Sequence, residues 1–242
     1  MKRKKKHYKC LIFDADHTLL DYVADEYAAF TKVYREIGMP TASLLLEDSR
    51  RFSEETWTEA GLYDVDDPLV QTTYHKTYRS HVSGIFEKVF EKYGNPTSVT
   101  AEKAGELFLK ALEAEGKPLG NAKTFLEELS KKYTVCIATN GLTNIQKGRL
   151  AAFEKFATVY VSEAIGCIKP LPAFFRHILK RQRASKKACL MIGDSLRSDV
   201  AGAKSVGIDA CWFNPERREN TSGIPTDYEI SALENLRIIL EK

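Results

Sequence analysis

The chain has 242 residues and a mass of 27.3 kDa, with 43% hydrophobic and 29% charged residues. This composition is typical of a globular protein and excludes fibrous and wholly disordered classes. At about 150 residues per domain, the length predicts one or two domains. No apolar run approaches the roughly 18 residues that a membrane-spanning helix needs, so we expect no membrane partner.

The formal net charge of +3 is concentrated at the N-terminus, where residues 1–7 form a basic leader. Without the five cations from Lys2 to Lys6, the chain has 31 Lys and Arg residues and 33 Asp and Glu residues. The apolar stretch after the leader stops at Asp14, which is too short for a signal peptide. We interpret the leader as a solvated end, with a nucleic-acid or targeting tail as the alternative. The rest of the chain has no basic stripe interleaved with aromatics, so we expect no nucleic-acid polymer as a partner.

The five cysteines form no C-x-x-C pair. Four of them, Cys10, Cys136, Cys189 and Cys211, lie inside short apolar runs, where a free cysteine behaves as a small hydrophobe. An odd number at these spacings argues against a disulfide framework or a zinc site. We therefore expect a reducing, cytoplasmic location.

Five short apolar runs predict buried strands, at residues 8–13, 133–138, 158–161, 188–192 and 208–213. Most are continuous rather than alternating, as in parallel strands that are covered on both faces. Apolar residues at helical spacing, such as Phe125 and Leu129, lie between the later runs. This alternation of strand and helix predicts an α/β fold with a doubly wound parallel sheet.

Residues 21–117 break the alternation, because they are rich in helix formers and aromatics and contain no convincing strand. A span of nearly a hundred residues is too long for a simple loop in a compact domain. We therefore predict an all-helical cap domain at 21–117, inserted into an α/β catalytic core formed by residues 8–20 and 118–242. Near the C-terminus, residues 231–234 (SALE) predict a capping box that opens the last helix.

Polar residues stand at or shortly after the ends of four predicted strands. They are Asp14, Asp16, Thr139, Asn140, Gly141, Lys169, Asp194 and Asp199. Ligands of an open parallel sheet bind outside the carboxyl ends of its strands, near the point where the strand order reverses, so these residues should converge. Each motif taken alone also fits a turn or a helix cap. Their joint occurrence, each after an apolar run, favours the functional interpretation.

Three carboxylates at one point repel one another unless a cation lies among them. A ligand set of oxygens without sulfur favours a hard cation such as Mg²⁺, and Lys169 would supply a second positive charge. We expect Asp14, Asp16, Asp194 and Asp199 to form the metal site, with Asp16 contributing its backbone carbonyl. Asp199 alternatively holds water of the metal's shell or orients Lys169.

Asp14 can attack phosphorus as a carboxylate nucleophile and form an aspartyl-phosphate. Asp16, two residues later, suits general acid and base work, because it can protonate the leaving alkoxide and then activate water. The expected catalytic groups are Asp14, Asp16, Thr139 and Lys169. The groups expected to bind the phosphoryl oxygens of the substrate are Thr139, Asn140, Gly141 and Lys169.

These motifs resemble those of the haloacid dehalogenase superfamily of phosphohydrolases. The D-x-D-x-T motif is found at residues 14–18, the Ser or Thr motif at Thr139, the Lys motif at Lys169 and the G-D-x-x-x-x-D motif at residues 193–199. The resemblance runs from Tyr8 onward. It implies a Rossmann-like core, the helical cap of the first subclass, and Mg²⁺-dependent hydrolysis of phosphoric monoesters.

Shorter strings are similar to the pyrimidine 5′-nucleotidase branch of that superfamily: residues 138–146, 161–163, 211–215 and 224–226. This similarity implies hydrolysis of nucleoside monophosphates, including noncanonical ones, in a house-cleaning role. His17 stands where family members often carry Gly, Asp or Glu, and we interpret it as a turn residue. The expected partner is a small phosphomonoester, and the expected assembly is a monomer or weak dimer.

Other functions fit parts of the pattern. The same chemistry could act on a sugar phosphate or another small metabolite, or serve a phosphosugar mutase. A receiver-like signalling domain, which is not an enzyme, also places acidic residues, a hydroxyl, a Lys and Mg²⁺ around a phosphorylated Asp. Asp16 and the long insertion argue against a receiver, and a metal-free dehalogenase would not need Asp16.

The cap would set specificity by closing over the leaving group. A nucleobase could stack on an aromatic side chain of the cap. The aromatic candidates are Trp57, Tyr63, Tyr74 and Tyr78, and the polar candidates are Arg50, Arg51, His75 and Arg79. Tyr74 and Tyr78 are four residues apart, so they alternatively form the hydrophobic core of the cap.

Overall fold

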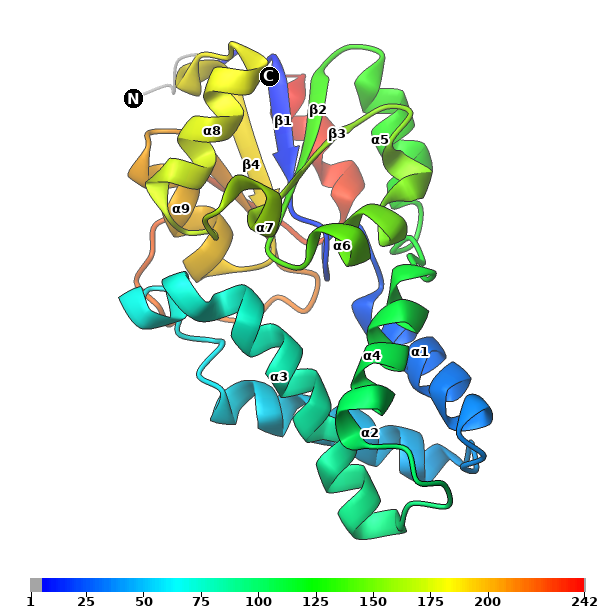
Figure 1. The fold of residues 1–242 in the computed structure, drawn as a ribbon. Coiled ribbons are helices and arrows are strands. Elements are labelled where there is room, and N and C mark those ends of the chain that lie inside the picture. The colour runs from blue at the N-terminus through cyan, green and yellow to red at the C-terminus, as the bar shows by residue number, and fades with distance from the viewer. Residues whose placement is uncertain (1–5, 242) are drawn as a thin grey trace. The chain divides into compact units, whose positions relative to one another are not determined.

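The computed structural model describes residues 6–241, which divide into two compact units (Figure 1). The first unit comprises the chain up to Leu20, Pro118–Asn140, and the chain from Ala152 onward. The second comprises Asp21–Lys117 and Gly141–Ala151. Most of the basic leader expected at residues 1–7 lies outside the described residues. Among the described residues, no helix has both the length and the apolar character to cross a bilayer.

The first unit contains a six-stranded sheet with the order β3-β2-β1-β4-β5-β6, and every neighbouring pair is parallel. The strands are β1 (Cys10–Phe13), β2 (Thr134–Thr139), β3 (Thr158–Val161), β4 (Cys189–Gly193), β5 (Asp209–Phe213) and β6 (Tyr228–Ile230). The predicted α/β class is confirmed, and five strands lie where the apolar runs predict them. The sixth, β6, is absent from the prediction because it has only three residues and a mixed burial pattern.

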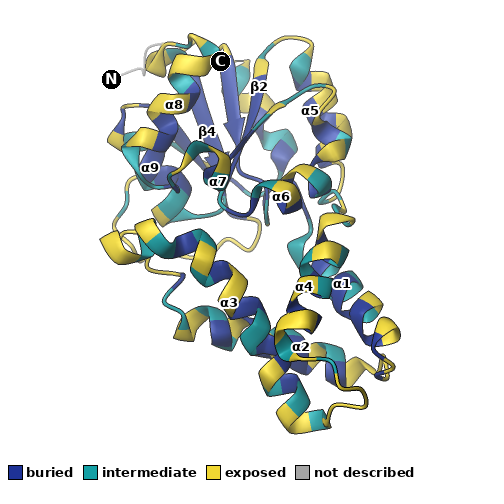
Figure 2. Cartoon of the chain, viewed as in Figure 1, coloured by how far each residue is buried: buried dark blue, intermediate teal, exposed yellow. Residues whose placement is uncertain are grey.

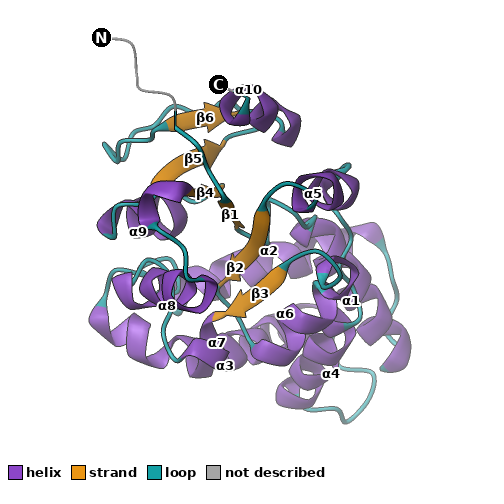
Figure 3. Cartoon of the chain, turned by 90° about the horizontal axis from the view of Figure 1, so that it is seen from above, coloured by secondary structure: helices purple, strands orange, loops and turns teal. Residues whose placement is uncertain are grey.

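Helices cover both faces of this sheet (Figure 3). The α-helices of the first unit are α5 (Ala122–Ser130), α7 (Ser162–Ile165), α8 (Pro172–Gln182), α9 (Gly202–Ser205) and α10 (Leu236–Leu240). Shorter helical turns are η1 (Ala151–Phe153), η2 (Lys186–Ala188), η3 (Leu196–Ala201, a π-helical turn) and η4 (Leu233–Asn235). Helices α8 and α9 lie on one face, and α5 and α10 lie on the other (Figure 3).

Burial of the strands on both faces explains why their sequences are continuous rather than alternating. Strands β1, β2, β4 and β5 are buried along most of their length, whereas the helices alternate buried and exposed sides (Figure 2). One face packs against α8 and α9 in a single core cluster, which includes Ile12, Ala138, Phe174, Phe175, Met191 and Ala203. Successive strand residues point to opposite faces, so Leu11 and Phe13, both fully buried, face α5 and α10.

The described residues of the second unit form helices joined by loops, as predicted for the insertion. Its helices are α1 (Tyr22–Glu36), α2 (Ser43–Glu59), α3 (Pro68–Tyr93), α4 (Ala101–Glu113) and α6 (Thr143–Arg149). Asp67 and Thr100 accept N–H groups at the starts of α3 and α4, as N-caps do. Phe30 and Phe108 lie at the centre of the aromatic core, with ring centroids 4.5 Å apart.

Helix α6 follows β2 directly in the chain and groups with the second unit. Its last residue, Arg149, donates from Nη2 to Oδ2 of Asp25 in α1 at 2.8 Å, and both side chains are only 1% exposed. The other oxygen of Asp25 accepts the N–H groups of Gly116 and Lys117 at 3.2 and 2.8 Å. A single buried carboxylate therefore joins α1, α6 and the segment that leaves the insertion.

The capping box predicted at residues 231–234 is wrong. The Oδ1 atom of Asn235, rather than a carboxylate at Glu234, accepts the N–H of Ala232 at 3.1 Å. Glu234 instead accepts a hydrogen bond from Nδ2 of Asn121, at the start of α5, at 2.6 Å. The pattern was misleading because a partner more than a hundred residues away engages the Glu234 side chain.

Candidate active site

Asp14 follows β1 at the point of the sheet where the strand order reverses. Its N–H donates to the carbonyl of Ile192 in β4 at 2.8 Å, so the ladder between the two strands positions its backbone. The chain then turns sharply, because the N–H groups of Leu19 and Leu20 both donate to the carbonyl of Ala15. Crevices at such reversal points are the usual ligand sites of open α/β sheets.

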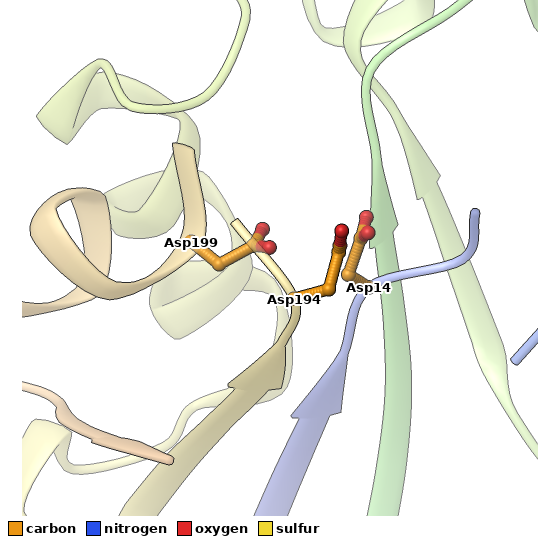
Figure 4. A group of neighbouring side chains, drawn as sticks. All are labelled: Asp14, Asp194 and Asp199. Atoms are coloured by element: carbon orange, nitrogen blue, oxygen red, sulfur yellow. The ribbon is translucent and has the colours of Figure 1, made fainter. Parts of the chain in front are cut away.

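Three of the predicted carboxylates come together at this edge. Asp14, Asp194 and Asp199 each offer an oxygen within 4.8 Å of the others, and the three groups gather at the ends of β1 and β4 (Figure 4). Asp199 is fully buried and Asp14 is 8% exposed. Asp194 is partly exposed as a whole residue. The expected convergence of these three positions is therefore present in the structure.

Lys169 lies among the carboxylates, as its place after a predicted strand suggests. Its Nζ is 2.5 Å from Oδ1 of Asp14 and 2.6 Å from Oδ1 of Asp199, and the residue is 2% exposed. Burial lowers the pKa of Lys169, but the charges of Asp14 and Asp199 more than offset this and leave the pKa above its ordinary value. The ammonium is therefore protonated at neutral pH.

The single positive charge of Lys169 does not balance the negative charges of three carboxylates. Burial, and then the charge of Asp14, raise the pKa of Asp199 to about 7 despite its ion pair with Lys169. Burial and the charges of Asp14 and Asp199 hold the pKa of Asp194 well above its usual range. The cluster therefore has an excess of negative charge that a cation would relieve. A buried set of oxygen donors without sulfur fits a hard divalent ion such as Mg²⁺.

The G-D-x-x-x-x-D motif explains how Asp199 reaches the cluster. A Cβ atom on Gly193 would lie only 2.2 Å from Oδ2 of Asp199, so no other residue leaves room for this carboxylate. That oxygen also accepts the N–H of Ser195 at 3.1 Å. The Oγ of Ser195 in turn caps η3 by accepting the N–H of Ser198 at 3.1 Å.

The Thr139-Asn140-Gly141 motif ends β2, next to β1 in the sheet. Thr139 is 1% exposed, and its Oγ1 donates to the carbonyl of Asn140 at 3.2 Å. The Asn140 side chain contacts the backbone of Lys169, a contact that sequence reasoning misses because the partners are 29 residues apart. Gly141 has a φ of 149°, and a Cβ there would lie 2.9 Å from Cγ of Gln146. Glycine therefore permits the close approach of Gln146.

Asp16 lies in the turn after β1, where it forms a short bridge with Leu20. Its side chain is not part of the carboxylate group found among the described residues. This arrangement is compatible with the expectation that Asp16 offers its backbone carbonyl, and not its side chain, to a metal. Its acid and base role stays a prediction.

The aromatic candidates of the cap separate into buried and exposed side chains. Tyr74 and Tyr78 are 4% and 9% exposed and pack with their rings 6.2 and 5.5 Å from Trp57. They form part of the cap core, as the alternative interpretation states. Tyr63 is 58% exposed, and its ring packs edge-on against Trp57 with centroids 6.2 Å apart.

Three of the four polar candidates of the cap, Arg50, Arg51 and Arg79, contact groups on their own helices, and the ring of the fourth, His75, packs edge-on against Tyr74. Arg50 pairs with Glu54 at 3.0 Å, and Arg51 pairs with Asp48 at 2.9 Å. Arg79 donates to the carbonyl of the residue four positions earlier at 3.1 Å. The three arginine side chains therefore form ion pairs and a hydrogen bond along the surfaces of their helices.

Comparison with known proteins agrees with this geometry. A profile of the haloacid dehalogenase-like hydrolases matches residues 8–207. The chain is 32% identical to the pyrimidine 5′-nucleotidase PynA of Streptococcus pneumoniae, over 97% of this chain and 96% of that protein. It is 24% identical to the pyrimidine 5′-nucleotidase YjjG of Escherichia coli, over 96% of this chain and 97% of that protein.

A crystal structure of the HAD-hydrolase YfnB from Bacillus subtilis, bound to magnesium, has a similar fold. Its TM-score is 0.82 at 27% identity, and the match covers 98% of this chain and 100% of that one. The resemblance drawn from the motifs is thereby confirmed across nearly the whole length. The chain is an enzyme that belongs to the haloacid dehalogenase-like hydrolases.

Proposed function

We propose that this enzyme is a Mg²⁺-dependent phosphomonoesterase that hydrolyses nucleoside 5′-monophosphates, those of pyrimidines foremost, through an aspartyl-phosphate. The observation that carries the proposal is the buried contact of Lys169 with both Asp14 and Asp199, at 2.5 and 2.6 Å, beside the carboxylate of Asp194. A nucleophile, a cation and a metal-binding carboxylate at one sheet edge are what phosphoryl transfer requires.

In this proposal Asp14 attacks the phosphorus atom. Its carboxyl oxygen Oδ1 lies 2.5 Å from Nζ of Lys169, and a carboxylate is the form that attacks phosphorus. A bond forms between a carboxylate oxygen and phosphorus while the bond from phosphorus to the ester oxygen breaks. Asp16 gives its proton to the leaving alkoxide and then accepts a proton from the water that hydrolyses the aspartyl-phosphate.

The remaining residues bind the phosphoryl group and the metal. Thr139 and the N–H groups of residues 140–141 hold phosphoryl oxygens, together with Lys169. The residues that would hold Mg²⁺ are Asp14, Asp194, the backbone carbonyl of Asp16, and Asp199 at the periphery. When bound there, Mg²⁺ supplies positive charge that offsets both the carboxylates and the phosphoryl group.

The substrate class is supported by the relatives. Both PynA and YjjG, which span nearly the whole chain, are pyrimidine 5′-nucleotidases. Sugar phosphates and other small phosphomonoesters are the competing substrates, because the chemistry at Asp14 is the same for all of them.

A phosphate-release screen tests the proposal. Nucleoside mono-, di- and triphosphates and a set of sugar phosphates are incubated with the enzyme in Mg²⁺, with Asp14→Asn as the inactive control. We expect the highest kcat/KM on a pyrimidine nucleoside monophosphate, and loss of turnover with EDTA that Mg²⁺ restores. Preference for a sugar phosphate would overturn the substrate class. Hydrolysis without a metal, or by Asp14→Asn, would overturn the mechanism.

A further inference from the structure

Asn140 stands between Thr139 and Gly141, at a position expected to contact substrate. Its side chain instead makes two hydrogen bonds to the backbone of one residue, Lys169. Its Oδ1 accepts the Lys169 N–H at 2.8 Å, and its Nδ2 donates to the Lys169 carbonyl at 3.0 Å. The two ends of one amide therefore engage both peptide groups of the residue that carries the ammonium.

The contact matters because of where Lys169 lies in the fold. Asp14 and Asp194 directly follow β1 and β4, and the ladder between these strands positions them both. Lys169 follows α7 and lies in the loop before α8. The sheet ladder does not extend to that loop, so other contacts must position the ammonium. Asn140 directly follows β2, which pairs with β1, and it therefore connects the loop to the strands that carry Asp14.

The loop is also packed closely on another side. A Cβ on Gly202 would lie 3.0 Å from Cα of Pro170 and 2.4 Å from Cε2 of Phe175. Ile168 is fully buried, and its carbonyl accepts the N–H of Leu171 at 3.0 Å in a tight turn. The loop therefore rests against the start of α9, while Asn140 holds the backbone of Lys169 toward the end of β2.

We propose that Asn140 is a positioning residue, whose side-chain amide holds the Lys169 backbone so that the ammonium lies between Asp14 and Asp199 during phosphoryl transfer. The inference rests on the proposed function, in which Lys169 acts on the phosphoryl group. A displacement of about 1 Å in such a group can lower turnover by two orders of magnitude. A hydrogen bond that holds the backbone is thus sufficient to influence catalysis without touching substrate.

The test compares Asn140→Ala with the control Asn121→Ala, which removes the amide that bonds to Glu234 on the surface of the first unit. Steady-state kinetics are measured with a nucleoside monophosphate and with para-nitrophenyl phosphate, whose leaving groups differ. We expect Asn140→Ala to lower kcat roughly tenfold to a hundredfold for both substrates, by a similar factor and with little change in KM. We expect Asn121→Ala to leave both constants unchanged.

A second measurement, hydrogen exchange, tests the hydrogen bond between the Lys169 N–H and Asn140 directly. The Lys169 amide should exchange its hydrogen faster in Asn140→Ala than in the wild type, and at an unchanged rate in Asn121→Ala. If the alanine variant does not fold, Asn140→Leu gives the same comparison, because leucine has a similar shape but neither accepts the Lys169 N–H nor donates to the Lys169 carbonyl.

Two results would overturn the inference. One is a raised KM at unchanged kcat, or an effect on only one of the substrates, which would assign Asn140 to direct substrate contact. The other is unchanged exchange at Lys169. An inactive wild-type enzyme would contradict the proposed function instead, and the exchange rates would still show whether Asn140 holds the Lys169 backbone.

Discussion

Glu26 carries a buried carboxyl in α1, where it is only 3% exposed. It accepts a hydrogen bond from Oγ of Ser53 at 2.6 Å, and Nε of Arg50 lies 3.8 Å away. Burial raises the pKa of Glu26 to about 7, although Ser53 and Arg50 oppose the rise. The folded protein therefore keeps a proton on Glu26 at pH values where the unfolded chain has released it.

The sign of the stability effect follows from this proton. Between the ordinary pKa of 4.5 and about 7, the folded state binds more protons at Glu26 than the unfolded state. The contribution of Glu26 to the free energy of unfolding must then fall as pH rises through this window. Burial also lowers the pKa of His81 to about 4, and its contribution falls as pH decreases. The two effects oppose each other, so only a variant can separate them.

Glu26→Gln isolates the carboxyl, since glutamine has nearly the same shape and does not titrate. The contribution of His81 is common to both proteins and cancels in their difference. Relative to the wild type, we expect the variant to gain roughly 2 to 3 kcal/mol of unfolding free energy between pH 5 and pH 8. Urea unfolding at the two pH values measures this. Parallel pH profiles of the two proteins would contradict the account.

At the scale of elements, α6 depends on a buried ion pair. Arg149 and Asp25 are each 1% exposed, so removing one partner leaves an uncompensated charge in the interior. We expect Arg149→Met to lower the free energy of unfolding by about 3 to 5 kcal/mol. The matched control is Arg237→Met, which breaks the exposed pair with Glu128 and should cost less than about 1 kcal/mol. Equal losses in the two variants, measured by urea unfolding, would refute this account of α6.

Elements and site residues differ in how far the sequence predicts them. Continuous apolar runs locate five strands, because burial on both faces leaves a local signature. The edge strand β6 has no such signature. Helix α6 contacts the second unit through the pair of Asp25 and Arg149, which are 124 residues apart, and through its packing on α4. No local pattern encodes a contact at that separation.

The same contrast holds within the site. The motifs predict that Asp14, Asp194, Asp199 and Lys169 converge, since the carboxyl ends of parallel strands share one edge. The side-chain amide of Asn140 could not be assigned to the Lys169 backbone in this way. An Asn followed by Gly predicts a turn. The partner of its side chain is the loop at Lys169, which lies 29 residues later in the sequence.

At the scale of the whole molecule, the predicted chemistry depends on residues drawn from the whole length of the first unit. Asp14 lies near the start of the chain, and Asp199 lies 185 positions later, yet both bond to the same ammonium. Only a completed parallel sheet brings these positions together. In the proposed function, this cluster transfers a phosphoryl group to Asp14 and then to water.

Trapping the phosphorylated enzyme tests whether the phosphoryl group passes through Asp14. Asp16→Asn removes the group that activates water. Hydrolysis of the aspartyl-phosphate should then be slower than its formation, so the phosphorylated enzyme should accumulate. The variant is mixed with Mg²⁺ and para-nitrophenyl phosphate, whose leaving group needs little protonation, quenched in acid and analysed by peptide mass spectrometry. The account predicts a phosphoryl group on Asp14, and none when Asp14→Asn is added to the variant. Phosphate release at the wild-type rate with no modified peptide, or phosphorylation at another residue, would contradict it.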